Sequence, residues 1–214
     1  MSLSIRHINK AYDGKTVFDD FSLDFTEGVI TCILGPSGCG KTTLLNIIAG
    51  IEEPDSPSEN GFATKNLSYI FQEPRLLPWK TVKGNIEFVM PDNLSPQERS
   101  ERADELIMRV ELEGFSDYFP GALSGGMKQR VSIARAMACR ADVVLMDEPL
   151  NGLDYGLKQN LMEWLADIWR SEHMTVIFVT HYLDEALAVG DEVIELSRNP
   201  ASVLKKYKTE KPLH

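Results

Sequence analysis

The sequence has little of what marks a membrane-spanning or nucleic-acid-binding chain. Its 214 residues carry 22 lysines and arginines against 32 aspartates and glutamates, which gives a formal net charge of -10. A chain with this balance lacks the basic field that attracts nucleic acid or an anionic membrane surface. Apolar runs such as residues 29–34 and 175–179 are far shorter than the roughly 18 residues of a membrane span. We therefore expect no nucleic-acid partner, and a membrane link only through another protein.

Cysteine is also scarce, and its pattern excludes a disulfide framework. Cys32, Cys39 and Cys139 are an odd, scattered set without C-x-x-C spacing. No charged and then apolar leader opens the sequence, so we expect reduced thiols in the cytosol. Cys39 lies inside the phosphate-binding motif described below. It is either a target for thiol chemistry or a small residue that fills space, and we favour the second interpretation.

Short segments with strand character, several of them continuous apolar runs, recur along the chain. They lie at residues 29–34, 67–71, 143–146, 175–179 and 192–196. Helical patterns lie between them, at residues 41–49, 126–138, 155–171 and 184–189. This alternation predicts an α/β fold with a mainly parallel sheet. We expect a single domain over residues 1–214, because the chain is long enough for one sizeable core and too short for two.

Other segments fall outside this alternation. Residues 4–25 alternate apolar and polar positions around Asp13-Gly14, which predicts an N-terminal antiparallel β lobe. Residues 95–98 read Ser-Pro-Gln-Glu, a capping box that begins a helix. We place a helical subdomain insert roughly at residues 74–140 on this basis. Residues 52–66 predict a loop, and we expect the polar tail from Lys205 onward to be frayed.

A glycine-rich segment with the pattern G-x-x-x-x-G-K-[ST] lies between the first buried strand and the following helix. It consists of Gly35, Pro36, Ser37, Gly38, Cys39, Gly40, Lys41 and Thr42, with Thr43 next in the chain. Such glycines let backbone N–H groups point at phosphate oxygens, and the helix adds its positive end. The lysine neutralises the β and γ phosphates, and the threonine hydroxyl binds Mg²⁺. The pattern predicts a P-loop NTPase core that binds ATP and Mg²⁺, rather than a glycine-rich turn that binds nothing.

The predicted strand at residues 143–146 is followed by two carboxylates, Asp147 and Glu148. Consecutive strand side chains diverge, so the two acids can have different roles. Asp147 is suited to hold Mg²⁺ through its water shell, and Glu148 to polarise the attacking water as a general base. Without the phosphate motif upstream, two solvated acids would be the simpler interpretation.

A second candidate anion site, formed by Ser124, Gly125 and Gly126, lies at the head of the predicted helix 126–138. Serine is a good N-cap, and the glycines let the backbone approach an anion at a helix N-terminus. Read alone, the three residues are equally a capped helix start. With the P-loop and Asp147-Glu148, however, the sequence Leu-Ser-Gly-Gly-Met-Lys-Gln at residues 123–129 resembles the signature of ABC transporter ATPases. The resemblance implies that two copies pack head to tail, each ATP lying between one copy's P-loop and the other's signature.

The resemblance covers nearly the whole chain and implies further roles. Tyr12 resembles the aromatic residue that stacks on adenine. Gln72 resembles the glutamine that contacts Mg²⁺ and water and senses the membrane partner, and His181 resembles the switch histidine that contacts the γ-phosphate. Asp154, in the run Asn-Gly-Leu-Asp, resembles the residue that organises the opposite site. The candidate catalytic residues are Glu148, His181 and Gln72, and the candidate metal ligands are Thr42, Gln72 and Asp147.

One subgroup of the family is especially similar. Residues 71–82, with Leu-Pro-Trp at their centre, and Asn85-Ile86 are similar to import ATPases for nitrate, aliphatic sulfonates, taurine and thiamine-precursor pyrimidines. The turn Ser197-Arg198-Asn199-Pro200 resembles the same group. This implies an ATPase that drives import of a small anionic or heterocyclic solute from the cytoplasmic face of the membrane. Its partners would be transmembrane permease subunits and, indirectly, a substrate-binding protein.

The sequence also departs from the family pattern. Residues 50–72 are short for the antiparallel strands usually found there, and Asn151-Gly152 replaces a pair of smaller residues. Two alternatives stay open on sequence grounds. One is a non-transport ABC ATPase, such as an iron-sulfur assembly ATPase. The other is an ATP-binding regulatory module without catalysis, against which Glu148 and His181 argue.

Overall fold

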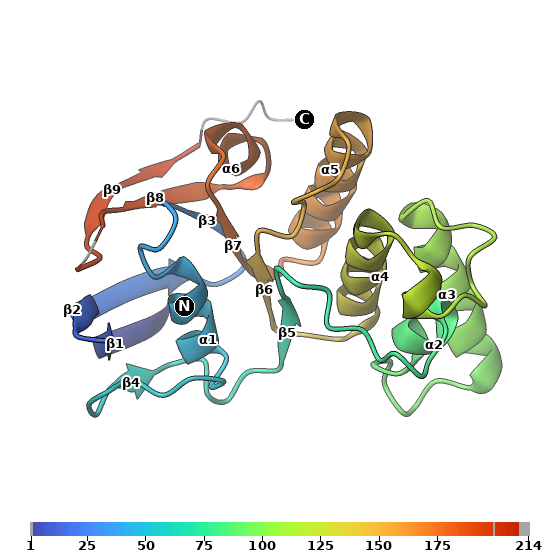
Figure 1. The fold of residues 1–214 in the computed structure, drawn as a ribbon, viewed down its shortest axis with the longest axis horizontal. Coiled ribbons are helices and arrows are strands. Elements are labelled where there is room, and N and C mark those ends of the chain that lie inside the picture. Colours follow the sequence, from blue (N-terminus) through green and yellow to red (C-terminus); the bar gives the residue numbers. More distant parts are fainter. Residues whose placement is uncertain (1, 199, 210–214) are drawn as a thin grey trace.

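Two β-sheets organise the computed structural model, which describes residues 2–198 and 200–209 (Figure 1). The smaller sheet has the order β2-β1-β4 and consists of β1 (Ser2–Tyr12), β2 (Lys15–Thr26) and β4 (Glu59–Asn60). The larger has the order β5-β6-β7-β3-β8-β9. Its strands are β3 (Ile30–Leu34), β5 (Leu67–Ile70), β6 (Val143–Asp147), β7 (Thr175–Thr180), β8 (Glu192–Leu196) and β9 (Val203–Lys208). The α-helices are α1 (Lys41–Ile48), α2 (Val82–Glu87), α3 (Pro96–Arg109), α4 (Gly125–Ala138), α5 (Tyr155–Ser171) and α6 (Leu183–Val189).

The larger sheet is mainly parallel. Strand β3 pairs in parallel with β7 and β8, and β6 pairs in parallel with β5 and β7. Strands β1 and β2 pair antiparallel around the turn at Asp13-Gly14, both of which have positive φ. The predicted α/β fold and antiparallel N-terminal lobe are thus confirmed. The third strand of that lobe, β4, has only two residues, in keeping with the short segment noted in the sequence.

Alternating strand residues supply two separate cores, because both faces of the larger sheet are covered. On one face, Ile33, Leu145 and Ile177 pack with helix α1 and with apolar side chains of the smaller sheet. On the other, Val144 and Phe178 join apolar residues from helices α2 to α6. Burial on both faces explains why these strands read as continuous apolar runs. Helix α1 therefore lies between the two sheets and fixes the loop that precedes it.

Helices α2, α3 and α4 pack against one another. Figure 1 shows them as a group beside the β5 edge, away from the smaller sheet. They fall within residues 74–140, and we propose this group as the helical subdomain of one domain spanning residues 1–214. In the part of the chain that the structure describes, none of the helices combines the length and hydrophobicity that a membrane crossing requires.

Helix α2 is absent from the sequence-based prediction. It is only six residues long and contains Gly84, so hydrophobic periodicity gives little signal. It is stabilised by burial of Val82 and Ile86 and by local hydrogen bonds. The Thr81 side chain caps it by accepting from Gly84 N at 3.1 Å. The buried Asn85 side chain accepts from Leu77 N and donates to the carbonyls of residues 77, 80 and 81.

The prediction of a frayed tail from Lys205 is wrong as far as Lys208. Residues 203–208 form the edge strand β9, which pairs antiparallel with β8. The pairing is supported by Lys206, which lies 3.1 Å from the Glu192 carboxylate, and by the Tyr207 hydroxyl, which donates to Glu195 at 3.2 Å. The polar composition of residues 203–208 gives no strand signal in the sequence, because this strand is stabilised by its cross-strand partners. Residues 210–214, and Asn199 in the predicted turn 197–200, lie outside the described residues.

Candidate nucleotide site

A pocket of about 390 Å³ lies where the P-loop meets the carboxyl ends of strands β6 and β7. Ligands of open α/β sheets bind at this edge. Most of the lining residues were expected from the sequence. They are Tyr12, Ser37, Gly38, Gly40, Lys41, Thr42, Thr43, Gln72, Glu148 and His181, together with Val17. The fold thus brings residues from positions 12 to 181 into one place.

The P-loop wraps the start of helix α1. Gly40, the N-cap residue, has φ 101° and Gly38 has φ 78°. A Cβ on Gly40 would lie 2.5 Å from Val17 and 2.9 Å from the Phe18 ring, so only glycine fits there. The Lys41 ammonium donates to the carbonyls of Gly35 at 2.7 Å and Pro36 at 3.1 Å. The loop therefore holds its cation at the pocket wall, where the backbone N–H groups and the helix end also favour an anion.

Asp147 lies at the end of β6, behind the P-loop threonine, and is almost fully buried. Burial raises the pKa of its carboxyl above the ordinary value, and a hydrogen bond from Thr42 opposes this rise. A buried carboxylate beside a threonine hydroxyl, next to a pocket that Gln72 also lines, fits Mg²⁺. This ion takes oxygen ligands and is usually held by one or two protein groups plus phosphate and water. Within the described residues, no cluster of three or more His, Cys, Asp or Glu side chains could hold a metal by itself.

Glu148 is held by three side chains from different loops. Its Oε1 lies 2.9 Å from His181 Nδ1. Its Oε2 accepts from Gln72 Nε2 at 3.4 Å and from Asn151 Nδ2 at 3.1 Å. Glu148 follows β6 with a positive φ of 45°, so backbone geometry beyond the strand, not strand alternation, separates it from Asp147. Non-glycine residues rarely adopt such a conformation, which is typical of functional sites.

Tyr12 lies at the rim of the pocket and keeps 42% of its surface exposed. Its hydroxyl donates to Glu52 and lies 3.4 Å from the Thr43 hydroxyl. Burial of the hydroxyl and the Glu52 carboxylate raise the pKa of Tyr12 above its ordinary value. The Lys10 ammonium, 3.3 Å from Glu52, completes the group. The phenol is thus anchored at its hydroxyl, and the Lys10 ammonium lies 5.4 Å from the ring centroid, while the exposed part of the ring stays available for stacking.

Other predicted residues stand apart from the pocket surface. The Cys39 side chain is fully buried, and burial raises the pKa of its thiol, which favours the unreactive protonated form. Ser124 caps helix α4 by accepting from Met127 N at 3.3 Å. Gly125 and Gly126 begin that helix, where a Cβ on Gly126 would lie 3.5 Å from Gly152 O. Asp154 caps helix α5 by accepting from Leu157 N at 3.0 Å. The serine-glycine loop therefore does not line this chain's own nucleotide pocket.

Comparisons with known proteins agree with this geometry. The profile of the ABC transporter family matches residues 18–151, more than half of the chain. This chain belongs to the ABC transporter family. It is 40% identical over 201 residues to the aliphatic sulfonates import ATP-binding protein SsuB 1 of Pseudomonas savastanoi pv. phaseolicola, covering 94% of this chain and 83% of that protein. It is 37% identical over 213 residues to the taurine import ATP-binding protein TauB of Yersinia pestis bv. Antiqua, covering 95% and 83%.

Other relatives of this ABC family chain are longer. It is 37% identical over 207 residues to the sulfate/thiosulfate import ATP-binding protein CysA of Synechocystis sp., covering 92% of this chain but only 58% of that protein. Among solved structures, the dimeric post-hydrolysis state of the ATP-binding cassette MJ0796, bound to ADP and Pi, superposes with a TM-score of 0.85 at 29% identity. That match covers 99% of this chain and 100% of that one.

The structure of this ABC family chain also shows contacts that the sequence did not single out. Asn151 was noted only as a departure from the family pattern, yet its amide donates to the candidate general base. Glu52 lay in a segment predicted to be loop, and it anchors Tyr12. Tyr12 and Glu52 are brought together only by the fold. Asn151 follows Glu148 closely in the chain, and its contact depends on how the chain turns after β6.

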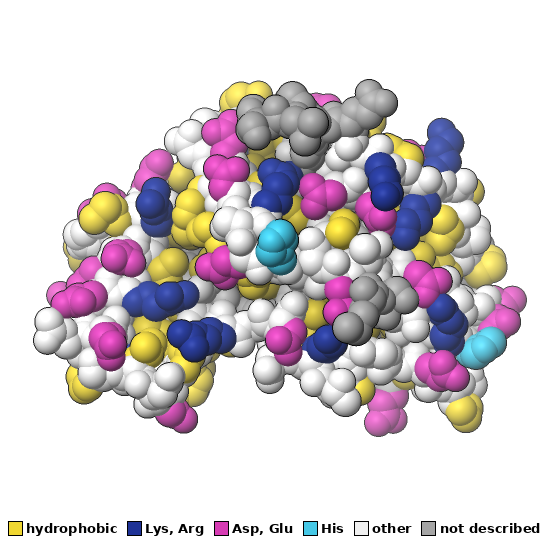
Figure 2. Space-filling view, turned by 180° about the vertical axis from the view of Figure 1, so that it is seen from behind, with side chains coloured by type: hydrophobic (Ala, Val, Ile, Leu, Met, Phe, Trp, Pro, Cys, Tyr) yellow, Lys and Arg dark blue, Asp and Glu magenta, His cyan; other side chains and the backbone are white. Residues whose placement is uncertain are grey.

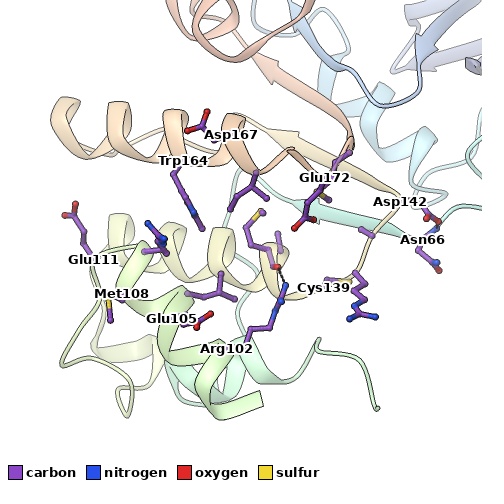
Figure 3. A pocket seen from close by; sticks show the side chains of 18 residues that line it. Asn66, Arg102, Glu105, Met108, Glu111, Cys139, Asp142, Trp164, Asp167 and Glu172 are labelled. Carbon is purple, nitrogen blue, oxygen red and sulfur yellow. Dashed lines mark hydrogen bonds between the residues drawn. The ribbon is translucent and has the colours of Figure 1, made fainter. Parts of the chain in front are cut away.

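A larger hollow of about 1230 Å³ lies at the other edge of the sheet (Figure 3). Asn66, Asp142 and Met174 line it directly before strands β5, β6 and β7 begin. Trp164 of α5 and Arg102 of α3 face it from opposite sides. None of the predicted site residues of this ABC family chain lines it. Because it lies at the amino ends of the strands, it is separate from the nucleotide site.

Proposed function

We propose that this chain is the ATP-binding and ATP-hydrolysing subunit of an ABC importer. The observation that carries the proposal is the position of Glu148. The carboxylate faces the P-loop pocket and is held by His181 and Gln72, beside the buried Asp147. A general base, a phosphate-binding loop and a candidate metal carboxylate in one pocket suit hydrolysis of a nucleoside triphosphate.

In this proposal each group has a separate task. Lys41 and the backbone N–H groups of the P-loop bind the phosphates, and Tyr12 offers its ring to the adenine. Glu148 accepts the proton of the attacking water, and the contact with His181 fixes its orientation. Thr42, Asp147 and Gln72 would hold Mg²⁺, which would supply charge neutralisation at the phosphates. Because its hydrogen bonds already orient Glu148, less free energy is needed to position the base during turnover.

A second copy of the chain completes the site in this proposal. Ser124, Gly125 and Gly126 form a capped, glycine-rich helix start, yet they lie outside the pocket that holds the P-loop. Head-to-tail pairing would place each such loop on the ATP bound by the partner's P-loop and would create two equal sites. The fold match to a cassette described as dimeric supports this arrangement.

We propose that the permease subunits bind an exposed aromatic patch on the helical group. It consists of Trp79, Phe88, Tyr118 and Phe119, which are 71%, 60%, 46% and 51% exposed. Two segments distant in sequence carry it, held together where Val82 N donates to Tyr118 O at 2.8 Å. Exposed aromatic groups of this kind mark protein interfaces. The chain from Gln72 to Trp79 leads from the nucleotide pocket to this patch, which suits transmission of movement to a membrane partner.

The proposed location is the cytoplasmic face of the membrane, reached through the permease. On the face shown in Figure 2, lysine and arginine side chains are interspersed with aspartate and glutamate. Such a surface offers little direct attraction to anionic headgroups. In this proposal the permease and a substrate-binding protein select the cargo. Because the relatives are named as import ATP-binding proteins for sulfonates, taurine and sulfate, we propose a small anionic solute. The heterocyclic alternative rests on the resemblance of residues 71–82 alone.

The Glu148→Gln variant tests the proposed function. It keeps the size of the side chain and removes the base, so steady-state ATP hydrolysis should fall at least about 100-fold while ATP still binds. ATP should drive this variant into a stable dimer in size-exclusion chromatography with light scattering. Glu163→Gln, the same change on an exposed face of α5, serves as the control and should behave like the wild type. Brisk hydrolysis by Glu148→Gln would contradict the assignment.

A further inference from the structure

A buried ion pair joins helix α5 to helix α6 close to His181. Lys158 Nζ contacts the Glu185 carboxylate, and only 19% and 7% of the two side chains are exposed. The other carboxylate oxygen of Glu185 accepts from the Thr180 hydroxyl at 2.6 Å. Thr180 is itself buried and directly precedes His181. Removing the lysine would leave the buried Glu185 charge without its cation, which is costly.

The same lysine also contacts the residue that follows His181. Lys158 Nζ lies 4.8 Å from the ring centroid of Tyr182, within the range of a cation–π contact. The Tyr182 ring centroid lies 3.9 Å from that of His181, with the planes tilted by 39°. The Tyr182 N–H donates to the Thr180 hydroxyl at 3.1 Å. His181 is therefore flanked on both sides in sequence by residues that the Lys158–Glu185 pair holds.

We infer that Lys158 is a positioning residue for ATP hydrolysis, acting through Tyr182 and Glu185 to set the His181 ring against Glu148. The inference rests on the proposed function. Lys158 does not line the nucleotide pocket, whereas His181 lines it and lies 2.9 Å from Glu148. Lys158 is in the first turn of α5, where its N–H donates to the carbonyl of Asp154 at 3.0 Å. It thus links the loop that follows the general base to the histidine that orients that base.

A purely structural role for the pair predicts something different. In that case, loss of Lys158 would lower the free energy of unfolding, and any loss of activity would follow the fraction of folded protein. A positioning role lowers kcat in the folded protein while the KM for ATP changes little, because phosphate binding by the P-loop is untouched. A misplacement of about 1 Å in a catalytic group can cost on the order of 100-fold in rate.

The test compares Lys158→Met, Lys158→Arg and Tyr182→Ala by steady-state ATP hydrolysis, each in the wild-type and the His181→Ala background. Lys158→Met and Tyr182→Ala should lower kcat roughly 10-fold or more, with KM within about threefold of the wild-type value. Lys158→Arg keeps the charge over the ring and should recover most of the rate. With His181→Ala already present, Lys158→Met should have little further effect, because the residue it positions is gone.

The control is Lys65→Met, which removes the lysine of the pair with Glu27, 3.9 Å apart and remote from the site, and should leave kcat unchanged. Three results would overturn the inference: an unchanged kcat in folded Lys158→Met, no recovery in Lys158→Arg, or an equal loss with and without His181. If Lys158→Met does not fold, Tyr182→Ala tests the inference instead, because Tyr182 is half-exposed. A wild-type kcat in Tyr182→Ala would also contradict the inference. A wild-type chain that does not hydrolyse ATP would instead refute the proposed function.

Discussion

Glu148 shows how much of the chemistry depends on the conformation of one residue. Its φ of 45° turns the chain directly after β6, so that Asp147 stays buried while the next side chain reaches into the pocket. The backbone of Glu148 is held by its N–H, which donates to Val179 O at 3.0 Å. The neighbouring strand β7, which His181 directly follows, thus stabilises a conformation that would otherwise be costly.

Glycine requirements in the P-loop give a prediction at the same scale. Gly40→Ala combines a positive φ with a Cβ inside contact distance of Val17 and Phe18, so we expect it to lower the free energy of unfolding by about 2–5 kcal/mol. Gly38→Ala is the matched variant, because φ is also positive but no atom lies within 4 Å of the added Cβ. Gly38→Ala should lower the free energy of unfolding by only about 1–2 kcal/mol. Urea unfolding of both variants measures the difference, and equal costs would refute the steric argument.

At the scale of elements, helices α2 to α5 begin with side-chain caps, whereas α1 and α6 have none. Thr81, Ser95, Ser124 and Asp154 each accept a backbone N–H at the start of α2, α3, α4 and α5. Helix α3 has the complete capping box, in which Glu98 also accepts from Ser95 N at 2.7 Å. Caps fix where each helix starts, and the starts of α4 and α5 carry the loops assigned to the dimer.

The capping box gives the second prediction. Ser95→Ala should lower the free energy of unfolding by about 1 kcal/mol at neutral pH. Ser100→Ala, in the middle of the same helix, should be neutral or slightly stabilising, because alanine has the higher helix propensity. Hydrogen bonds from Ser95 hold the pKa of Glu98 below its ordinary value. The stabilisation by Glu98 is therefore present above the unfolded pKa and is lost as the pH falls through the folded one.

Denaturant titrations of wild type and Ser95→Ala at pH 7 and in acid check this pH dependence. The difference in free energy of unfolding between the two proteins should shrink in acid. Protonation of Glu98 weakens the capping box in the wild type, whereas the variant has already lost it. A difference that stays constant or grows as the pH falls would show that the box contributes through something other than the Glu98 carboxylate.

At the scale of the whole molecule, the two phosphate-binding loops are separated within one chain. The P-loop opens to the nucleotide pocket, and the Ser124 loop does not line it. Gly126 is instead close to residues 152 and 153, in the segment that connects Glu148 to α5. A single copy therefore holds all the proposed groups without assembling them on one triphosphate. A symmetric pair is the simplest assembly that would do so.

Mixing two inactive variants tests this arrangement. Lys41→Ala impairs one copy's P-loop and Ser124→Arg impairs the other copy's signature, so a mixed head-to-tail dimer keeps one complete site. Equal mixing at random gives about half mixed dimers, and hence at most about a quarter of the wild-type number of sites. ATP hydrolysis should reappear on mixing. Pairing Lys41→Ala with the double variant Lys41→Ala/Ser124→Arg gives no complete site and should stay inactive. Recovery in that control, or none in the first mixture, would contradict the shared site.

Much of the element order was determined by the sequence, because its signals are local. Continuous apolar runs predict strands buried on both faces, and the glycine pattern at residues 35–42 predicts the loop between β3 and α1. The errors have physical causes. Helix α2 is short and contains a glycine, and β9 is a polar edge strand whose partners lie on β8.

The sequence by itself determined which residues carry chemistry, since each motif specifies its side chains within a few positions. Only the tertiary structure decided how they meet. It placed Glu148 between His181, Gln72 and Asn151, anchored Tyr12 to Glu52, and brought Lys158 against Tyr182 and Glu185. The reason is physical. Except for the local contact between Glu148 and Asn151, these contacts join residues well separated in the chain. Their distances follow from the packing of α1, α5 and α6 on the sheet rather than from any local preference.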